Sequence, residues 1–140
     1  MSEAWAGCKR GAIGDRRRRQ QIVNYEELRF GNITPTDMDG MIEYRGKGYV
    51  FMEFKLRAAP LKEGQRLCME RLVRDAWAAG KKAVALVLEH EVDDASRDIP
   101  AARCAVREYF YEPAKGWVAV RHYFTAYDMV SRFIAAMDGK

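Results

Sequence analysis

The stretch from Asp39 to Lys55 constrains the fold more than any other part of the sequence. It reads DGMIEYRGKGYVFMEFK, with an alternating run before Gly46-Lys47-Gly48 and a near-continuous apolar run after it. A glycine-rich turn between two such runs is typical of a β-hairpin. The second run, Tyr49 to Phe54, is apolar on both faces where it begins, so we expect a central strand that is covered on both sides.

Charged residues stand at the far end of this hairpin. Because successive side chains of a strand point to opposite faces, Glu53 and Lys55 share one face, on which Phe51 also lies. An antiparallel first strand brings Asp39 level with that end. Two carboxylates and a lysine would then gather at one edge of a buried sheet, where an unpaired charge is costly.

A pair of carboxylates supplies the hard oxygen ligands that Mg²⁺ and Mn²⁺ prefer. A metal held there lowers the pKa of a water molecule, and an ammonium group beside it can stabilise negative charge that develops on a phosphate. The residues themselves therefore indicate metal-assisted chemistry on a phosphate ester, with Asp39 and Glu53 as ligands and Lys55 beside them.

The order of these residues resembles the active-site signature of the PD-(D/E)xK nucleases. Thirteen residues separate Asp39 from Glu53-x-Lys55, and Gly64-Gln65 follows at the head of an expected helix. The superfamily includes many restriction enzymes, archaeal Holliday-junction resolvases and numerous phage nucleases. The resemblance covers roughly residues 20 to 90 and rests on all four elements in order, because Glu-x-Lys alone is common.

The resemblance implies a restriction-endonuclease-like α/β domain, with a central mixed β-sheet flanked by α-helices. It also implies endo- or exonucleolytic hydrolysis of DNA, with Mg²⁺ as the cofactor and Mn²⁺ as its substitute, in DNA repair or recombination. Asp39, Glu53, Lys55 and Gln65 would be the catalytic residues. The backbone carbonyl of Phe54 would join the two carboxylates as a metal ligand.

The first motif leaves the metal-binding aspartate open. It reads TPTDMD over residues 34–39, in place of a bare Pro-Asp, so that either Asp37 or Asp39 is the ligand. We prefer Asp39, because it opens the strand and shares the face of the other charged residues.

Many members of the superfamily place an accessory acid on a first helix. A helical pattern from about Arg16 to Phe30 puts Glu26 near the middle of its apolar side and Glu27 near the margin. The resemblance therefore makes Glu26 the candidate additional metal ligand. The alternative is an ordinary solvated glutamate, which is the reading we favour for Glu27.

The rest of the chain is expected to complete a single domain over residues 16–140, preceded by a flexible basic arm over residues 1–15. The long helix, from about Lys62 to Ala79, carries Gln65 in its first turn on its buried side. The other residues expected on that side are Cys68, Met69, Leu72, Ala76 and Ala79. Later elements are a buried strand parallel to its neighbour over 83–88, two edge strands over 103–111 and 117–123, and a final helix opened by the capping box Thr125-x-x-Asp128.

The charge distribution favours a nucleic-acid partner. The net charge is +4, and basic residues flank the expected site. DNA is the expected partner, recognised by form, such as branches or single strands, because no base-reading module is evident. Resolvases of the superfamily are symmetric dimers, so the resemblance also suggests a homodimer. The candidate nucleic-acid-binding residues are Arg57, Lys62, Arg66, Lys81 and Lys82.

Several other classes of protein fit the sequence poorly. The longest apolar run, Ala83 to Leu88, is too short to span a bilayer, and four arginines stand where a signal peptide needs an apolar block. We therefore expect a cytoplasmic protein of a bacterial or phage-infected cell. Three cysteines without Cys-x-x-Cys spacing argue against a disulfide framework or a structural zinc site.

Two readings compete with the nuclease. One is a protein that binds nucleic acid or supports assembly on the same fold without cleaving it. The other is an unrelated enzyme in which the charged cluster is only a buried salt-bridge network.

Overall fold

A computed structural model of the chain describes residues 15, 17 and 20–139. The chain divides into two units, Met1–Pro35 and Thr36–Lys140. The predicted basic arm lies, apart from Asp15, outside the described residues. The helices and strands named below all belong to the second unit.

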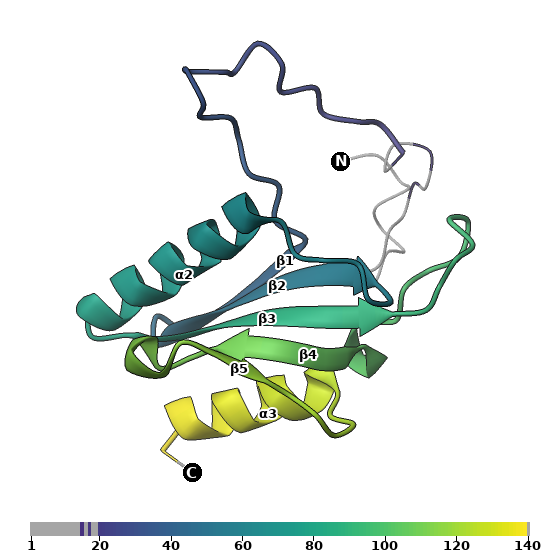
Figure 1. Cartoon of the computed structure of the whole chain (residues 1–140). Coiled ribbons are helices and arrows are strands. Elements are labelled where there is room, and N and C mark those ends of the chain that lie inside the picture. The colour runs from purple at the N-terminus through teal and green to yellow at the C-terminus, as the bar shows by residue number, and fades with distance from the viewer. Residues whose placement is uncertain (1–14, 16, 18–19, 140) are drawn as a thin grey trace. The chain divides into compact units, whose positions relative to one another are not determined.

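The second unit is built on a five-stranded mixed sheet, whose strands lie side by side in the order of the sequence (Figure 1). The strands β2 and β3 are parallel, and every other neighbouring pair is antiparallel. The predicted α/β class with a central mixed sheet is confirmed. The strands are β1 (Gly40–Tyr44), β2 (Gly48–Leu56), β3 (Lys82–His90), β4 (Ala105–Phe110) and β5 (Trp117–Ala119).

Two helices cover the two faces of this sheet (Figure 1). Helix α2 (Glu63–Ala78) connects the two parallel strands and packs on one face, and helix α3 (Ala126–Met137) packs on the other. Phe51 belongs to the apolar cluster beneath α2, whereas its neighbour Val50 belongs to the cluster beneath α3. The apolar run from Tyr49 to Phe54 therefore lies in β2, and the prediction that this strand is covered on both sides is confirmed.

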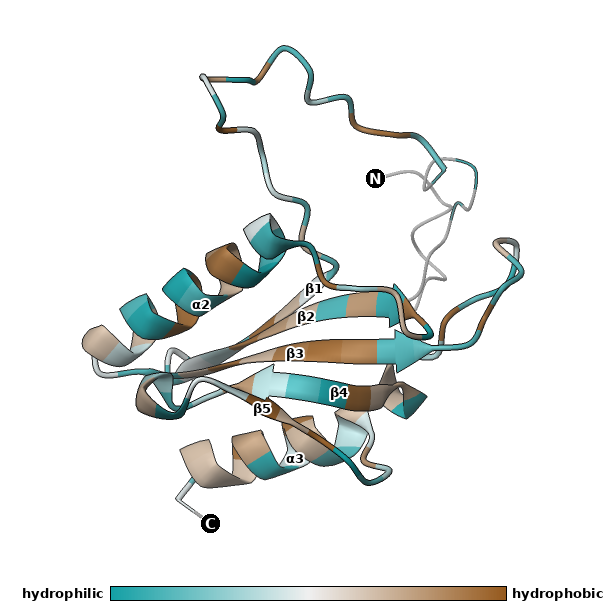
Figure 2. Ribbon diagram, viewed as in Figure 1, coloured by the Kyte–Doolittle hydropathy of each residue, from teal (hydrophilic) through white to brown (hydrophobic). Residues whose placement is uncertain are grey.

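The middle of β3, the central strand, is fully apolar. All residues of β3 from Ala83 to Leu88 are buried, and in Figure 2 this strand is brown along its middle and teal at its carboxyl end. Helical crossovers between parallel strands place such strands in the interior, where both faces lose contact with water. The predicted parallel pairing of this strand is confirmed, with Tyr49 opposite Ala83 and Glu53 opposite Val87.

Helix α2 buries a slightly different stripe from the predicted one. Met69, Val73 and Ala76 are buried, so the stripe follows positions four and three residues apart. Ala79, predicted to be buried, is exposed because it follows the last helical residue and is succeeded by Gly80 at φ +81°. Cys68 and Leu72 are half-buried.

Helix α3 begins as predicted. The Oγ1 atom of Thr125 accepts a hydrogen bond from the Asp128 amide at 3.2 Å, and the Asp128 carboxylate accepts one from the Thr125 amide. This reciprocal pairing satisfies two amides that the first turn would otherwise leave without partners. The predicted capping box is confirmed, and so is the expectation that this helix covers the sheet.

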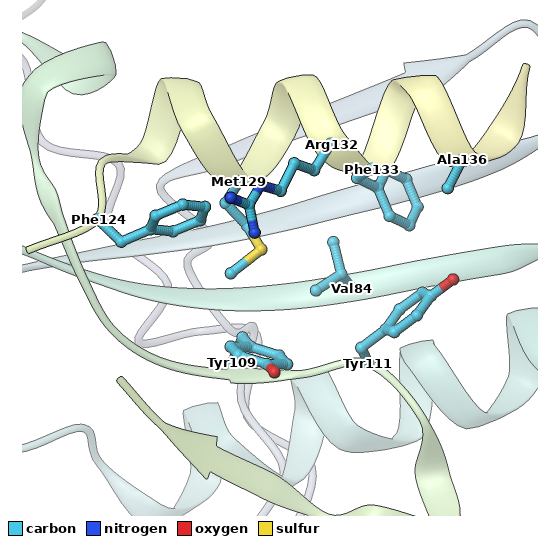
Figure 3. Close-up of a pocket in the computed structure, with 8 residues that line it drawn as sticks. All are labelled: Val84, Tyr109, Tyr111, Phe124, Met129, Arg132, Phe133 and Ala136. Carbon is cyan, nitrogen blue, oxygen red and sulfur yellow. The ribbon is translucent and has the colours of Figure 1, made fainter. Parts of the chain in front are cut away.

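A hollow of about 220 Å³ remains between α3 and the sheet (Figure 3). Its lining includes Val84, Tyr109 and Phe133. The Arg132 guanidinium carbon lies 4.6 Å from the ring centroid of Phe124 at this hollow. Arg132 therefore belongs to the layer on the α3 side of the sheet.

Over residues 20–30, the first unit lacks the helix that was predicted for residues 16–30. Over residues 20–30 the described backbone has turns and irregular structure, and Phe30 pairs with Ile33 across a tight turn in which Gly31 has φ +63°. Ile22 is 90% exposed and Val23 is 67% exposed. A short helix is marginal in water unless its apolar side is buried, and these side chains are not.

No helix within residues 20–139 has both the length and the apolar composition that a membrane crossing requires.

Gly48 is predicted to be essential for the packing of β2. A Cβ atom there would collide with the backbone carbonyl oxygen of Lys82 and lie 2.6 Å from the Met137 sulfur atom. We expect Gly48→Ala to lower the free energy of unfolding by about 1–3 kcal/mol, the usual cost of overpacking. Thermal and urea unfolding measure this loss. Gly64→Ala is the matched control, because a Cβ atom there meets nothing within 4 Å and alanine favours the helix; equal losses in both variants would contradict the prediction.

Candidate active site

The register of the hairpin brings Asp39 to the carboxyl end of β2. Gly40 pairs with Met52, so Asp39, one residue before, is level with Glu53. The Phe54 amide donates a hydrogen bond of 2.8 Å to Oδ2 of Asp39. The predicted meeting of these two carboxyl groups is therefore present in the structure, although Asp39 itself precedes the first residue of β1.

Asp37 takes a different position. It lines a hollow of about 10 Å³ together with Glu53 and Gln65, which is room for about one water molecule. Asp37 and Asp39 thus approach the same carboxyl group from different points, and only Asp39 is bound to the backbone of β2. Both aspartates thus lie near Glu53, and the choice of Asp39 as the metal aspartate stays a prediction.

A chain of polar contacts joins the other predicted site residues. Nε2 of Gln65 donates to Oε1 of Glu53 at 2.8 Å, and Oε1 of Gln65 accepts from Nζ of Lys55 at 3.1 Å. Nζ of Lys55 also lies 3.8 Å from Oε1 of Glu53. The first turn of α2 is therefore tied directly to the end of β2, because the Gln65 amide has one group that donates and one that accepts.

Glu53 is buried, with 5% of its surface exposed, and among residues 20–139 it is the one polar side chain in the core. It lies on the face of the sheet that α2 covers, beside Phe51 and Val87. Burial, followed by the charge and hydrogen bond of Asp39, raises the pKa of the Glu53 carboxyl from 4.5 to about 7, while Lys55 opposes this change. A second positive charge at this point would favour the ionised form of both carboxyl groups.

The donor set fits a hard divalent cation. Within the part of the chain that the structure describes, no three His, Cys, Asp or Glu side chains gather closely enough to hold a metal ion. Asp39 and Glu53 form a pair, and Mg²⁺ is commonly held by one or two carboxylates with water and substrate oxygens completing its shell. The observation that favours a cation here is a carboxyl pair whose Glu53 member is buried and only partly compensated by Lys55.

The structure places the two further predicted metal ligands, Phe54 and Glu26, in different units of the chain. Phe54 lies between Glu53 and Lys55 in β2, so its backbone is at the site, and its role as a ligand stays a prediction. Glu26 belongs to the first unit, where it is exposed and its amide donates to Oδ1 of Asn24 at 2.9 Å. The helix that was expected to present Glu26 is absent over residues 20–30, so the basis for choosing it, or Glu27, is lost.

Two of the predicted nucleic-acid-binding residues have acidic partners. Arg57 lies 2.5 Å from Asp93, and Arg66 lies 2.5 Å from Glu108. The Arg66 guanidinium also stacks on Trp117, with 4.5 Å between its carbon and the ring centroid. Their positive charge is therefore partly neutralised within the protein, which weakens the attraction they can exert on phosphates.

The three lysines of that group lie at different places in the fold. Lys62 is exposed directly before α2, close in sequence to Gln65. Lys82 opens β3 opposite Gly48, five positions before the residue that pairs with Glu53, so about 17 Å of strand separates them. Lys81 and Lys82 thus lie at the opposite end of the sheet from the carboxyl pair, whereas the sequence placed them beside it.

Sequence reasoning missed Arg107 and Glu108, two polar residues whose side chains reach the loop and helix that follow β2. A signal for them was present. Strict alternation would put Cys104, Val106, Glu108 and Phe110 on one face, with Glu108 interrupting an apolar series, whereas Cys104 and Val106 pack beneath α3 and Phe110 packs beneath α2. An interruption of this kind indicates either an exposed face or a bulge.

Comparison with known proteins adds no assignment: no family model matches the chain, and neither a curated protein nor a solved structure matches it.

Replacement of Glu53 by glutamine is predicted to change stability in a pH-dependent way. The pKa of Glu53 in the folded state is raised to about 7. Protonation of this carboxyl group therefore stabilises the fold fully below pH 4.5, and the contribution is lost as the pH rises through 7. Without divalent metal, Glu53→Gln should therefore gain stability relative to the unmodified protein by up to about 3 kcal/mol near pH 8, and much less near pH 5.

Thermal unfolding at the two pH values, in the presence of a chelator, measures this difference. Glu112→Gln is the matched control, because this carboxylate is on the surface and contacts Lys115 at 3.1 Å at the opposite end of the sheet. A stability difference between Glu53→Gln and the unmodified protein that stays the same at both pH values would contradict the prediction.

Proposed function

We propose that this protein is a metal-dependent nuclease that hydrolyses phosphodiester bonds in DNA. One observation carries the proposal: a buried carboxyl group, Glu53, meets Asp39 on one side and the Gln65–Lys55 pair on the other. The four residues of the sequence signature, from three different segments, thus lie together. The resemblance to the PD-(D/E)xK nucleases supports the same activity.

The proposed division of roles follows from the contacts. Asp39 and Glu53, with the Phe54 carbonyl, would hold a Mg²⁺ ion, for which Mn²⁺ is a substitute. When bound, the ion would act as a Lewis acid toward the phosphate oxygens. Lys55 would orient the attacking water and stabilise the charge that builds on the phosphate. Gln65 would hold the Lys55 ammonium in place through the 3.1 Å hydrogen bond.

We infer that the DNA is recognised by its form, such as a branch, an end or a single strand. Contacts with phosphates position a nucleic acid without reading its bases. Arg57 and Arg66 already have acidic partners, so Lys55 and Lys62 are the basic residues best placed to meet a phosphate near the site. Such a small set of contacts favours local recognition over a long base sequence.

Replacement of Lys55 by alanine, or of Glu53 by glutamine, is predicted to abolish cleavage while the fold is retained. A loss of at least about a hundredfold in rate is expected, because each change removes a group proposed to act on the reacting phosphate. The assay uses branched, flapped, linear and single-stranded DNA with Mg²⁺ or Mn²⁺, and circular dichroism checks the fold.

Lys115→Ala and Glu112→Gln are the matched controls, since this ion pair is exposed and lies at the opposite end of the sheet from Glu53. Both controls should cleave at the unmodified rate. A normal cleavage rate in either site variant would falsify the proposed roles.

A non-cleaving nucleic-acid-binding or assembly protein is the second candidate. One observation favours it: Lys55, Gln65 and Glu53 contact one another directly, without any external group between them. The same DNA panel discriminates between the two. Binding of DNA by the purified chain without cleavage in either metal would favour this candidate. Absence of metal binding in calorimetry would favour a buried salt-bridge network with another role.

A further inference from the structure

A β-bulge in β4 lies close to the candidate active site. Val87 of β3 pairs with Glu108, and the next residue, Leu88, pairs with Val106, so Arg107 is the extra residue. Val106 packs in the apolar cluster beneath α3, whereas Arg107 and Glu108 both make their contacts on the α2 side of the sheet. A bulge inserts one unpaired residue and redirects side chains, which is how two consecutive residues come to share a face.

Arg107 binds the loop that follows β2. Its Nη1 donates to the Ala59 carbonyl at 2.7 Å, and its Nη2 donates to the Arg57 carbonyl at 2.5 Å. Its Nε donates to the Glu89 carboxylate at 2.5 Å, which holds the guanidinium in place. The planar fork of an arginine can make these bonds together, whereas a lysine cannot reproduce them.

The loop held in this way is under backbone strain. Arg57 has φ +48°, a conformation that costs energy for a residue with a side chain. Its amide donates to the His90 carbonyl at 2.7 Å, so both its backbone groups are bound. The Ala59 amide donates to the Leu56 carbonyl at 3.1 Å, which closes the turn. The surrounding contacts therefore maintain a path that the loop would not keep alone.

Glu108 binds the other end of the same connection. Its Oε1 accepts a hydrogen bond from Arg66, in the first turn of α2 and next to Gln65. Arg66 is held further by Trp117, whose Nε1 donates to Glu70 at 2.6 Å. The bulge thus contacts the segment that follows Lys55 at Arg57 and Ala59, and it contacts α2 at Arg66, directly after Gln65.

We propose that Arg107 and Glu108 are positioning residues for the Lys55–Gln65–Glu53 chain. This proposal rests on the nuclease function proposed above. The two residues hold the end of β2 and the start of α2 at the separation that lets Gln65 bridge Lys55 and Glu53. Catalysis depends steeply on such geometry, since a displacement of about 1 Å can cost about a hundredfold in rate.

The main test compares Arg107→Lys with the unmodified full-length chain on the DNA that it cleaves. The variant keeps the charge but loses the fork to the two carbonyls. We expect kcat to fall by at least about tenfold and KM to change by less than about twofold, because positioning acts on the reaction and not on DNA binding. Glu108→Gln is the second variant, and it should lower kcat in the same way through Arg66.

Arg132→Lys is the matched control, because Arg132 packs on Phe124 at the other face of the sheet. It should keep the unmodified kcat. Arg107→Ala extends the test, because added guanidinium ion should restore part of its activity if the lost contacts are local. Unchanged kcat in Arg107→Lys, or equal losses in Arg132→Lys, would overturn the proposal.

Amide hydrogen exchange gives a readout that does not depend on cleavage. The Arg57 and Ala59 amides should exchange faster in Arg107→Lys, while those of the buried strand β3 stay protected. If the unmodified chain cleaves no DNA, the proposed function fails, and faster exchange in the variant would still support the structural part of the inference. Unchanged exchange at both loop amides would overturn the inference that Arg107 holds this loop.

Discussion

The carboxyl group of Glu53 is the constraint on which the rest of this site depends. A carboxylate taken out of water loses its hydration, and the protein must replace it with hydrogen bonds, an opposite charge or a proton. Gln65 supplies the hydrogen bond, Lys55 supplies the charge at 3.8 Å, and the raised pKa reflects what these two leave uncompensated. A core that served packing alone would be more stable with an apolar residue at this point. The cost is therefore reason to connect this residue with function.

The position of Glu53 follows from the pattern of β2. The strand is apolar on both faces at its start because two helices cover the sheet there. Small residues on the neighbouring strand, Ala83 and Ala85, lie in the cluster beneath α2 together with Ala76 of the helix itself. Small side chains let a helix approach a sheet closely, and this brings its first turn within hydrogen-bonding reach of the strand end. Packing at one end of α2 and polar contacts at the other thus act on a single rigid helix.

Much of this arrangement could be predicted from the sequence because the relevant signals are local. The hairpin, the buried parallel strand and the capping box of α3 each follow from spacing within a few residues, and Glu53, Lys55 and Gln65 follow from their places on those elements. The helix expected over residues 16–30 is absent over residues 20–30, because helical spacing alone does not show whether an apolar face will be buried. The ion pairs of Arg57 and Arg66 escaped prediction for another reason: their partners lie 36 and 42 residues away in sequence. The bulge at Arg107 likewise depends on pairing between strands.

The exposure of the site to solvent limits the kind of substrate that can bind there. Asp39 is exposed and Glu53 is buried, so the carboxyl pair extends from solvent into the core at the end of β2. The hollow beside Glu53 and Gln65 measures about 10 Å³, which leaves no room for a small substrate to be enclosed. A reacting group would have to meet these residues from outside, while the rest of its molecule remained on the surface. A phosphodiester within a long polymer satisfies that condition, because only one phosphate needs to reach the carboxyl pair. This shape suits the activity proposed above, in which a single phosphate of a polymer meets the carboxyl pair.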